Sequence, residues 1–285
     1  MSDIPFLVDA QWLIDNRDRV KVIDATTFLD QPEGDGYYDV SSGRAAYREA
    51  HVPGAVFADL LVDLADQDAP TTFTVLPSEE FARTIGDLGI SNDDHVVVYD
   101  QGANIWAARL WWNFRLEGFD RVSLLDRGIE AWKEAGQPLA SGEETLPPAQ
   151  FVARRRPERL ADAESVLAAI DDDATLLINS LDEATFRGDR QTYARPGRIP
   201  GSVNVSFWKQ FDDQGRAADI DTIRRSFESV GALDPSVKPV TYCGSGIAAS
   251  YLAFNLARLG REDVAVYDGS LTEWAADERL PLEVG

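Results

Sequence analysis

Short apolar segments alternate along this chain with segments whose apolar residues recur at helical spacing. The short segments are rich in valine, leucine, isoleucine and tyrosine, which is typical of buried strands. They cover residues 20–24, 95–100, 122–125, 176–179, 239–243 and 264–269. The periodic segments predict helices at residues 8–15, 44–50, 78–88, 104–116, 163–170, 220–230 and 247–259. Residues 34–43, rich in Gly, Asp and Ser, predict a loop.

This order of elements occurs twice. A Pro-Gly turn, a tyrosine that ends a strand and a tryptophan in a later helix recur at nearly constant spacing, as Pro53 and Pro200, Tyr99 and Tyr242, and Trp132 and Trp274. Strands that alternate with helices predict an α/β fold. We therefore expect two tandem domains, each a parallel sheet flanked by helices, at residues 1–140 and 160–285. Residues 141–159, rich in Pro and Arg, predict an extended linker.

The single cysteine, Cys243, lies where a predicted strand turns into a helix. In an open α/β sheet, ligands bind at the carboxyl ends of the strands. Gly244 and Gly246 allow successive backbone N–H groups to point inward and to form an anion cradle with the helix N-terminus. Such a cradle stabilises a thiolate or a persulfide. The alternative is an inert buried cysteine, which the glycine-flanked loop does not favour.

The segment Cys243-Gly244-Ser245-Gly246-Ile247-Ala248-Ala249 resembles the active-site loop of two-domain sulfurtransferases of the rhodanese and 3-mercaptopyruvate sulfurtransferase family. The resemblance implies that Cys243 carries the sulfur and that the six following residues bind the substrate. The uncharged Cys-Gly-Ser-Gly sequence is closer to the mercaptopyruvate branch, because the thiosulfate branch usually has cations after the cysteine. Ala248 departs from the family, in which many members have threonine there. The first copy has Asp100 in place of the cysteine, which implies a non-catalytic domain.

A small anionic sulfur donor needs a nearby cation. The resemblance implies that arginines before the second Pro-Gly turn supply it, with Arg187 and Arg195 as the best matches and Thr185 where the family has another arginine. Arg190 and Arg198 lie in the same segment, and each of these arginines is equally well explained as a surface ion pair.

The resemblance also suggests His51 as a relay partner for Ser245. The alternative is a histidine that caps the first Pro-Gly turn. Neither histidine has a second ligand at zinc spacing, and the expected chemistry needs no metal or cofactor. The expected reaction is covalent: Cys243 takes a sulfur from the donor and passes it to cyanide, a thiol or a protein acceptor.

A cysteine in such a loop is also compatible with two other classes of function. A cysteine phosphatase needs an arginine at the sixth position after the cysteine, where this chain has Ala249. A non-catalytic sulfur carrier or binding module is the second alternative. The intact Cys243 argues against it, but transfer to a protein acceptor stays open.

The composition is strongly acidic, with 49 Asp and Glu against 27 Lys and Arg and a net charge of −22. Most of the cations are arginines, and the lysines are Lys21, Lys133, Lys209 and Lys238. This composition is typical of halophilic proteins, whose surface repulsion is screened by salt; an acidic mesophilic protein is the alternative. It argues against nucleic-acid binding. The chain shows no long apolar run and no signal-peptide pattern, and one cysteine suits a reducing cytoplasm.

Overall fold

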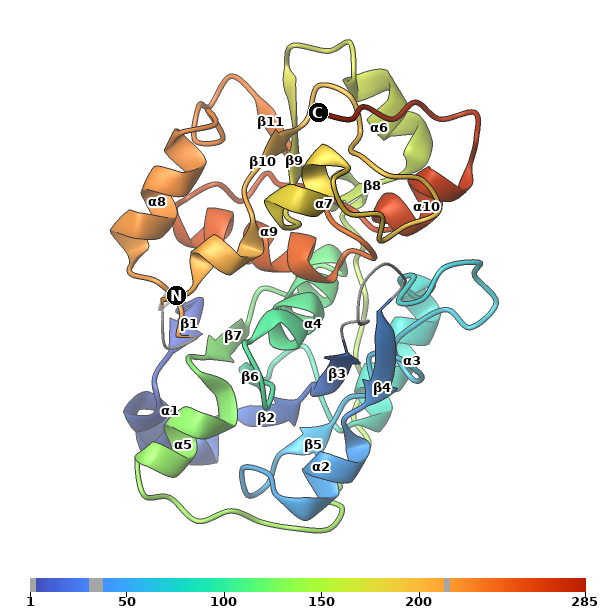
Figure 1. Ribbon diagram of the computed structural model, residues 1–285. Helices are drawn as coiled ribbons and strands as arrows, with labels where there is room; N and C mark the ends of the chain where they lie inside the picture. The colour runs from blue at the N-terminus through green and yellow to red at the C-terminus, as the bar shows by residue number, and fades with distance from the viewer. Residues whose placement is uncertain (1–3, 31–37, 213–215) are drawn as a thin grey trace. The chain divides into compact units, whose positions relative to one another are not determined.

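The computed structural model describes residues 4–30, 38–212 and 216–285. Its contacts divide the chain into two compact units (Figure 1). Unit 1 comprises residues 1–28 and 40–156, and unit 2 comprises residues 29–39 and 157–285. The domain limits 1–140, 141–159 and 160–285 stay a prediction. None of the helices in the described part of the chain combines the length and the apolar character needed to cross a membrane.

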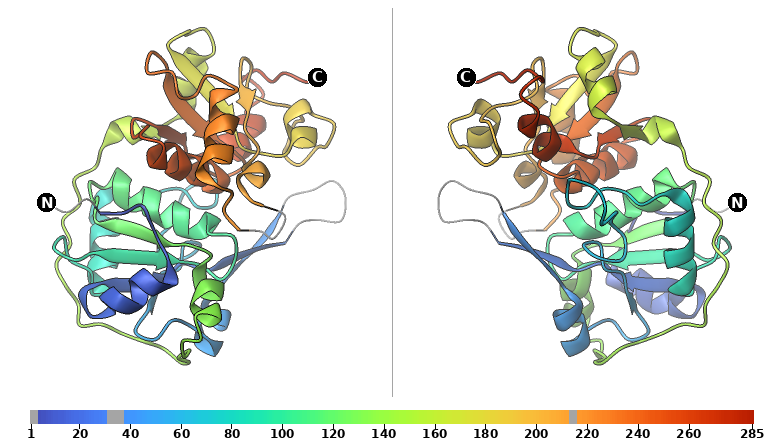
Figure 2. Two further views of the ribbon diagram at one scale, coloured as in Figure 1. Left: turned by 90° about the vertical axis from the view of Figure 1, so that its left-hand side faces the viewer. Right: turned by 90° about the vertical axis from the view of Figure 1, so that its right-hand side faces the viewer.

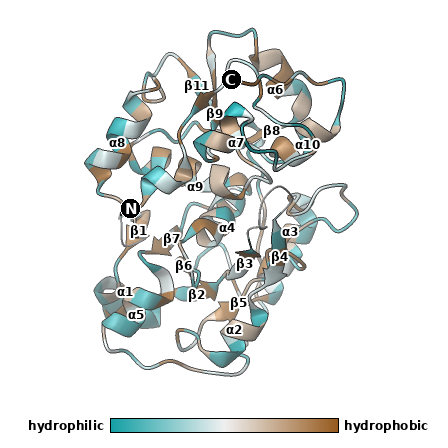
Figure 3. Ribbon diagram, in the orientation of Figure 1, coloured by the Kyte–Doolittle hydropathy of each residue, from teal (hydrophilic) through white to brown (hydrophobic). Residues whose placement is uncertain are grey.

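Unit 1 contains a five-stranded parallel sheet in the order β1-β7-β6-β2-β5. Its strands are β1 (Leu7–Val8), β2 (Lys21–Asp24), β5 (Val56–Phe57), β6 (Val96–Tyr99) and β7 (Val122–Leu125). The central strand β6 reads Val-Val-Val-Tyr and is buried throughout, as expected for a parallel strand covered on both faces. Figure 3 shows the hydrophobic colouring of β2, β5 and β7.

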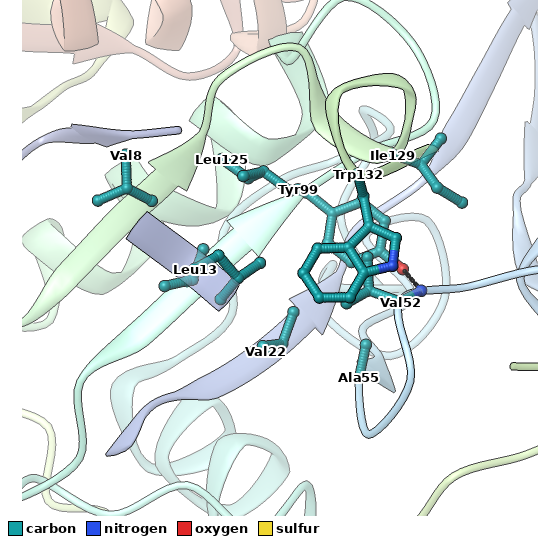
Figure 4. Packing of buried hydrophobic residues seen from close by; sticks show 10 residues of the cluster. Val8, Leu13, Val22, Val52, Ala55, Tyr99, Leu125, Ile129 and Trp132 are labelled. Carbon is teal, nitrogen blue, oxygen red and sulfur yellow. Dashed lines mark hydrogen bonds between the residues drawn. The ribbon is translucent and has the colours of Figure 1, made fainter. Parts of the chain in front are cut away.

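Helices cover both faces of this sheet. Figure 2 shows α4 on one face and α1 on the other. The helices of unit 1 are α1 (Ala10–Asn16), α2 (Arg44–Glu49), α3 (Ser78–Asp87), α4 (Ile105–Leu116) and α5 (Gly128–Glu134), with the 3-10 helix η1 (Arg17–Arg19). The α1 and α5 side holds a cluster of buried apolar residues around Leu13, Ile129 and Trp132 (Figure 4).

Unit 2 repeats this architecture. Its parallel sheet has the order β10-β9-β11-β12-β8, in which each strand corresponds to one of unit 1 in the same sequence of connections. The strands are β8 (Leu160–Ala161), β9 (Thr175–Asn179), β10 (Val203–Asn204), β11 (Lys238–Tyr242) and β12 (Ala265–Tyr267). The helices are η2 (Pro157–Arg159), α6 (Ala163–Ala169), α7 (Glu183–Arg187), η3 (Phe207–Gln210), α8 (Ile220–Glu228), α9 (Ile247–Arg258) and α10 (Ser270–Ala276). The predicted fold class, two α/β domains with parallel sheets, is therefore confirmed.

Three local predictions differ from the structure. The helix predicted at 8–15 begins later, because the Asp9 side chain caps α1 by accepting the Trp12 N–H at 2.7 Å, and the residues before it form β1. The loop predicted at 34–43 lies partly outside the described residues, and its end is β4 (Asp39–Ser42), paired with β3 (Thr27–Asp30). Helix α7 has no counterpart among the predicted helices; Asp182 caps it.

Candidate functional site

Cys243 follows directly after β11, the central strand of the unit 2 sheet, and it is 3% exposed and unpaired with another cysteine. Its backbone is held by the start of α10. The Cys243 N–H donates to Ser270 Oγ at 3.0 Å, and the Cys243 carbonyl accepts from the Leu271 N–H at 3.0 Å. The next carbonyl, of Gly244, accepts from the Thr272 N–H at 2.9 Å. These bonds fix the loop from one side.

Ser270 is the residue through which α10 reaches the loop. Its backbone has φ +49°, in the left-handed region that disfavours residues with a side chain. Its hydroxyl donates to the Tyr267 carbonyl at 2.7 Å while accepting from the Cys243 N–H. The two hydrogen bonds connect the cysteine to the end of β12, and they help to hold Ser270 in its strained conformation.

On the other side of the loop, α9 begins with its amino end towards the cysteine. Gly246 is the N-cap, with φ +78°, a conformation that glycine adopts without strain. Ser250 already bonds back to the Gly246 carbonyl, at 3.1 Å from N and 2.7 Å from Oγ. The N–H groups of Ile247, Ala248 and Ala249 are therefore the first-turn donors without a partner inside the helix. Such donors favour an anion.

In unit 1, the equivalent loop surrounds the carboxylate of Asp100. Asp100 follows β6 at the position equivalent to Cys243 and is 0% exposed. One carboxylate oxygen accepts from the N–H groups of Gly102 at 2.8 Å and Asn104 at 3.0 Å. The other accepts from Trp106 and Ala107, both at 3.0 Å, in the first turn of α4. Backbone donors of this loop thus surround a buried carboxylate.

The repeated tyrosines have the same structural task in both units. Val52, before the first Pro-Gly turn, donates its N–H to the Tyr99 hydroxyl at 3.0 Å. Ile199, before the second, donates to the Tyr242 hydroxyl at 3.2 Å. Burial raises the pKa of Tyr242 to about 12, so this phenol stays neutral. The tyrosine preceding each loop therefore fastens a turn from a distant part of the sequence to the sheet.

The two arginines named from the resemblance are both engaged elsewhere. Arg195 donates to the carbonyls of Trp274, Ala275, Asp277 and Leu280 at 2.7–3.0 Å. Arg187 pairs with Glu183 along α7, and its side chain is 54% exposed. Arg195 thus has a structural role and Arg187 forms a surface ion pair. None of these contacts involves the Cys243 loop.

Arg190 is a different case. Its guanidinium lies 3.5 Å from Asp182. Tyr38, which groups with unit 2, has its pKa raised by burial first, and then by Asp182 and Cys243, with Arg190 lowering it. Arg198 instead pairs with Glu283 and donates to the Gly285 carbonyl at 2.7 Å, which holds the C-terminal segment.

His51 is fully buried within unit 1. Its Nδ1 lies 2.7 Å from the Tyr47 carbonyl, and its ring stacks on that of Tyr47 at 4.2 Å between centroids. The His51 backbone forms a bridge with Ala140. These contacts tie α2 and the chain after α5 to the segment just before the first Pro-Gly turn. Ser245 lies in the unit 2 loop and is partly exposed.

Tyr193 was absent from the sequence-based site, although it lies against the loop. A Cβ built on Gly244 would come 2.0 Å from the Tyr193 hydroxyl oxygen. Thr185, where the family arginine was expected, is buried; it donates to Asp182 at 2.8 Å and lies 3.5 Å from the Thr192 hydroxyl. No sequence pattern marks Tyr193, because Gly244 is distant from it in the chain.

The loop carries no guanidinium of the kind that a phosphatase requires. Ala249, at the decisive position, is fully buried in the first turn of α9. The described loop therefore places a thiol just before a helix N-terminus, without a phosphate clamp from within the loop.

Comparison with known proteins agrees with this geometry. Residues 9–135 and 162–277 match the family described as "Rhodanese-like domain". The chain is 32% identical to 3-mercaptopyruvate sulfurtransferase of Mus musculus, covering 94% of this chain and 91% of that protein. It is 33% identical to thiosulfate/3-mercaptopyruvate sulfurtransferase 2 of Arabidopsis thaliana, covering 97% and 86%. The crystal structure of SseA from Escherichia coli, a 3-mercaptopyruvate sulfotransferase by its description, superposes with a TM-score of 0.80 at 29% identity, covering 93% of this chain and 98% of that one.

Proposed function

This chain belongs to the rhodanese-like domain family and is a sulfurtransferase, and we propose that its sulfur donor is 3-mercaptopyruvate in preference to thiosulfate. The sulfane sulfur passes through a persulfide on Cys243 to a thiol or cyanide acceptor. A protein thiol is included among the acceptors. The single cysteine suits a reducing cytoplasm, which we propose as the compartment.

One observation carries this proposal: the two equivalent loops hold different groups at the same point. In unit 1 the loop amides bind the Asp100 carboxylate, and in unit 2 the corresponding position is the Cys243 thiol. The Ala248 and Ala249 N–H groups correspond to those of Trp106 and Ala107, which contact the carboxylate. A thiolate or a persulfide anion on Cys243 would have these donors for its charge.

The reaction that follows is a double displacement. The Cys243 thiolate attacks the sulfur of 3-mercaptopyruvate, the S–S bond forms and the C–S bond breaks, and pyruvate leaves as its enolate, which takes a proton. The acceptor then attacks the outer sulfur of the persulfide, and the Cys243 thiolate is the leaving group. With cyanide as the acceptor the product is thiocyanate. The two half-reactions predict ping-pong kinetics.

The proposed binding groups are the six residues that follow Cys243 and one arginine of the 187–198 segment. Among the candidates, Arg190 has the loosest pairing, because its guanidinium lies 3.5 Å from Asp182 and its side chain is 49% exposed. Arg195 has four carbonyl partners and would have to lose some of them to bind a substrate. Arg187 is free to turn from Glu183. The His51 relay has the least support, because its Nδ1 lies against the Tyr47 carbonyl.

The donor preference rests on where the cations lie. Thiosulfate is a compact dianion whose charge is adjacent to the transferred sulfur, so it favours cations within the loop. Mercaptopyruvate keeps its carboxylate several atoms away, within reach of an arginine outside the loop. The residues after Cys243 are uncharged. Both donors should be assayed side by side for kcat/KM, with mass spectrometry for the gain of one sulfur on Cys243. We expect a higher kcat/KM with 3-mercaptopyruvate; a strong preference for thiosulfate would contradict the proposal.

A further inference from the structure

The side chain of Tyr193 leaves no room for a Cβ atom at Gly244. The Gly244 backbone, unlike that of Gly246, does not require the left-handed conformation. A Cβ at this position would instead lie 2.0 Å from the hydroxyl oxygen of Tyr193, 2.8 Å from Cζ and 3.1 Å from Cε1. All three distances are below ordinary van der Waals contact, so no side chain fits at position 244 while the phenol occupies its place.

The loop cannot easily retreat from Tyr193. The Gly244 carbonyl accepts from the Thr272 N–H at 2.9 Å, and the Cys243 backbone is bound to Ser270 and Leu271. Gly244 therefore lies between the first turn of α10 and the phenol. A shift of Gly244 would also displace the sulfur nucleophile, which is its immediate neighbour.

The phenol is also held in place. Tyr193 is 8% exposed, so its ring is packed in the interior. On its amino side, the Thr192 hydroxyl contacts Thr185 at 3.5 Å. On its carboxyl side, Arg195 donates to carbonyls around α10. A side chain buried to this degree, between neighbouring residues that are themselves in contact with the fold, does not swing aside without loss of packing.

We propose that Tyr193 is a specificity-determining residue for the sulfur donor: its phenol, packed over Gly244, excludes any side chain from the position after Cys243 and so keeps a cation away from the transferred sulfur. This inference rests on the proposed function, because it assumes that donors are discriminated at Cys243. The absence of a charged side chain directly after Cys243 is thereby explained by Tyr193, which lies on a different segment of the chain.

The test is a set of variants in which space and charge are changed separately. Gly244→Arg, Tyr193→Ala and the double variant Tyr193→Ala/Gly244→Arg are assayed for kcat and KM with 3-mercaptopyruvate and with thiosulfate. We expect the double variant to raise the thiosulfate to mercaptopyruvate ratio of kcat/KM by roughly tenfold or more, the effect of a favourable charge contact of moderate strength. Gly244→Arg alone should lower kcat/KM for both donors without that shift.

Matched variants separate this effect from general damage. Tyr193→Ala/Gly244→Gln adds length without charge and should not raise the ratio. Gly244→Ala tests space alone: it should lose activity with both donors, and Tyr193→Ala should restore part of it. If Tyr193→Ala does not fold, Tyr193→Leu retains apolar volume but lacks the three atoms that approach Gly244.

The outcomes are distinguishable. The role of Tyr193 would be overturned if Gly244→Arg raised the thiosulfate to mercaptopyruvate ratio of kcat/KM equally with and without Tyr193, or if Gly244→Ala kept full activity. Either result would leave the proposed function intact. If the unmodified protein forms no persulfide on Cys243 with either donor, the proposed function fails, and this inference fails with it.

Discussion

The loop after β6 in unit 1 and the loop after β11 in unit 2 occupy equivalent places in two copies of one fold. In unit 1, Asp100 brings its own negative charge into the loop, and four backbone N–H groups bind it. In unit 2, Cys243 stands at that position, beside the first turn of α9. The unit 1 loop thus shows that this fold can present backbone N–H groups to a carboxylate, whereas the chemistry proposed for unit 2 depends on one side chain.

The loops also differ in how they enter the helix. Unit 1 uses one more residue and reaches α4 through Asn104, whose φ is +61°. Unit 2 reaches α9 through Gly246 at φ +78°. Both caps are left-handed, which turns the first N–H groups of each helix back towards the strand end. The longer loop of unit 1 supplies the Gly102 and Asn104 donors that complete the carboxylate site.

The largest expected effect comes from copying the unit 1 side chain into unit 2. Cys243→Asp should abolish sulfur transfer, with a loss of roughly a thousandfold or more, because the nucleophile is gone and the carboxylate competes for the same amides. The measurement is thiocyanate formation from cyanide with each donor. Cys243→Ser, which removes the nucleophile without adding a charge, is the matched control and should be equally inactive. Substantial turnover by either variant would show that the comparison assigns the chemistry to the wrong side chain.

The next effect concerns stability in unit 1. Asp100→Ala would leave four buried N–H groups without their acceptor and should lower the free energy of unfolding by about 2–4 kcal/mol. Urea denaturation followed by tryptophan fluorescence measures this. Asp93→Ala, at an exposed position, is the control and should have little effect. An unchanged unfolding midpoint for Asp100→Ala would mean that the carboxylate is not what stabilises the loop.

The same carboxylate gives this prediction a pH dependence. Burial raises the pKa of Asp100 above 3.8, although hydrogen bonds from Ala107, Gly102 and Asn104 oppose the rise. The folded state then holds the proton more tightly than the unfolded chain. Tighter proton binding by the Asp100 side chain therefore contributes fully to stability below pH 3.8, and this contribution is lost as the pH rises through the raised pKa of the folded state. Over that window the wild type should lose stability relative to Asp100→Asn, which does not titrate; a parallel pH dependence of the two proteins would contradict the assignment.

The smallest effect is expected from salt, which should raise the melting temperature of the wild type and of the loop variants alike. A net charge of −22 predicts that molar salt raises the melting temperature by screening surface repulsion, since the Debye length falls from about 10 Å at 0.1 M to about 3 Å at 1 M. Wild type and Asp100→Ala should gain alike, because the buried carboxylate is shielded from the solvent ions. A melting temperature independent of salt would remove the argument for a halophilic surface.

Local patterns along the chain predicted most of the fold and the position of Cys243 between a strand and a helix. The Val-Val-Val-Tyr strand, the repeated Pro-Gly turns and the Cys-Gly-Ser-Gly loop are contiguous signals, and each formed the element expected of it. The short strand β4 was missed, because its residues alternate between exposed and partly buried and carry no apolar pattern. Helix α7 was missed for a similar reason: it has a cap and only one buried residue.

The duplication, the parallel α/β architecture and the cysteine between a strand and a helix could be predicted from the sequence, because each is marked by a local pattern of contiguous residues. The partners of the polar side chains around the candidate site become visible only in the folded chain. Arg195 proved to bind backbone carbonyls near the C-terminus, and Tyr193 proved to cover Gly244. Those contacts join segments far apart in sequence, where neither spacing nor residue type reveals the partner. The side chains that shape the loop are therefore set by packing, and packing exists only in the folded chain.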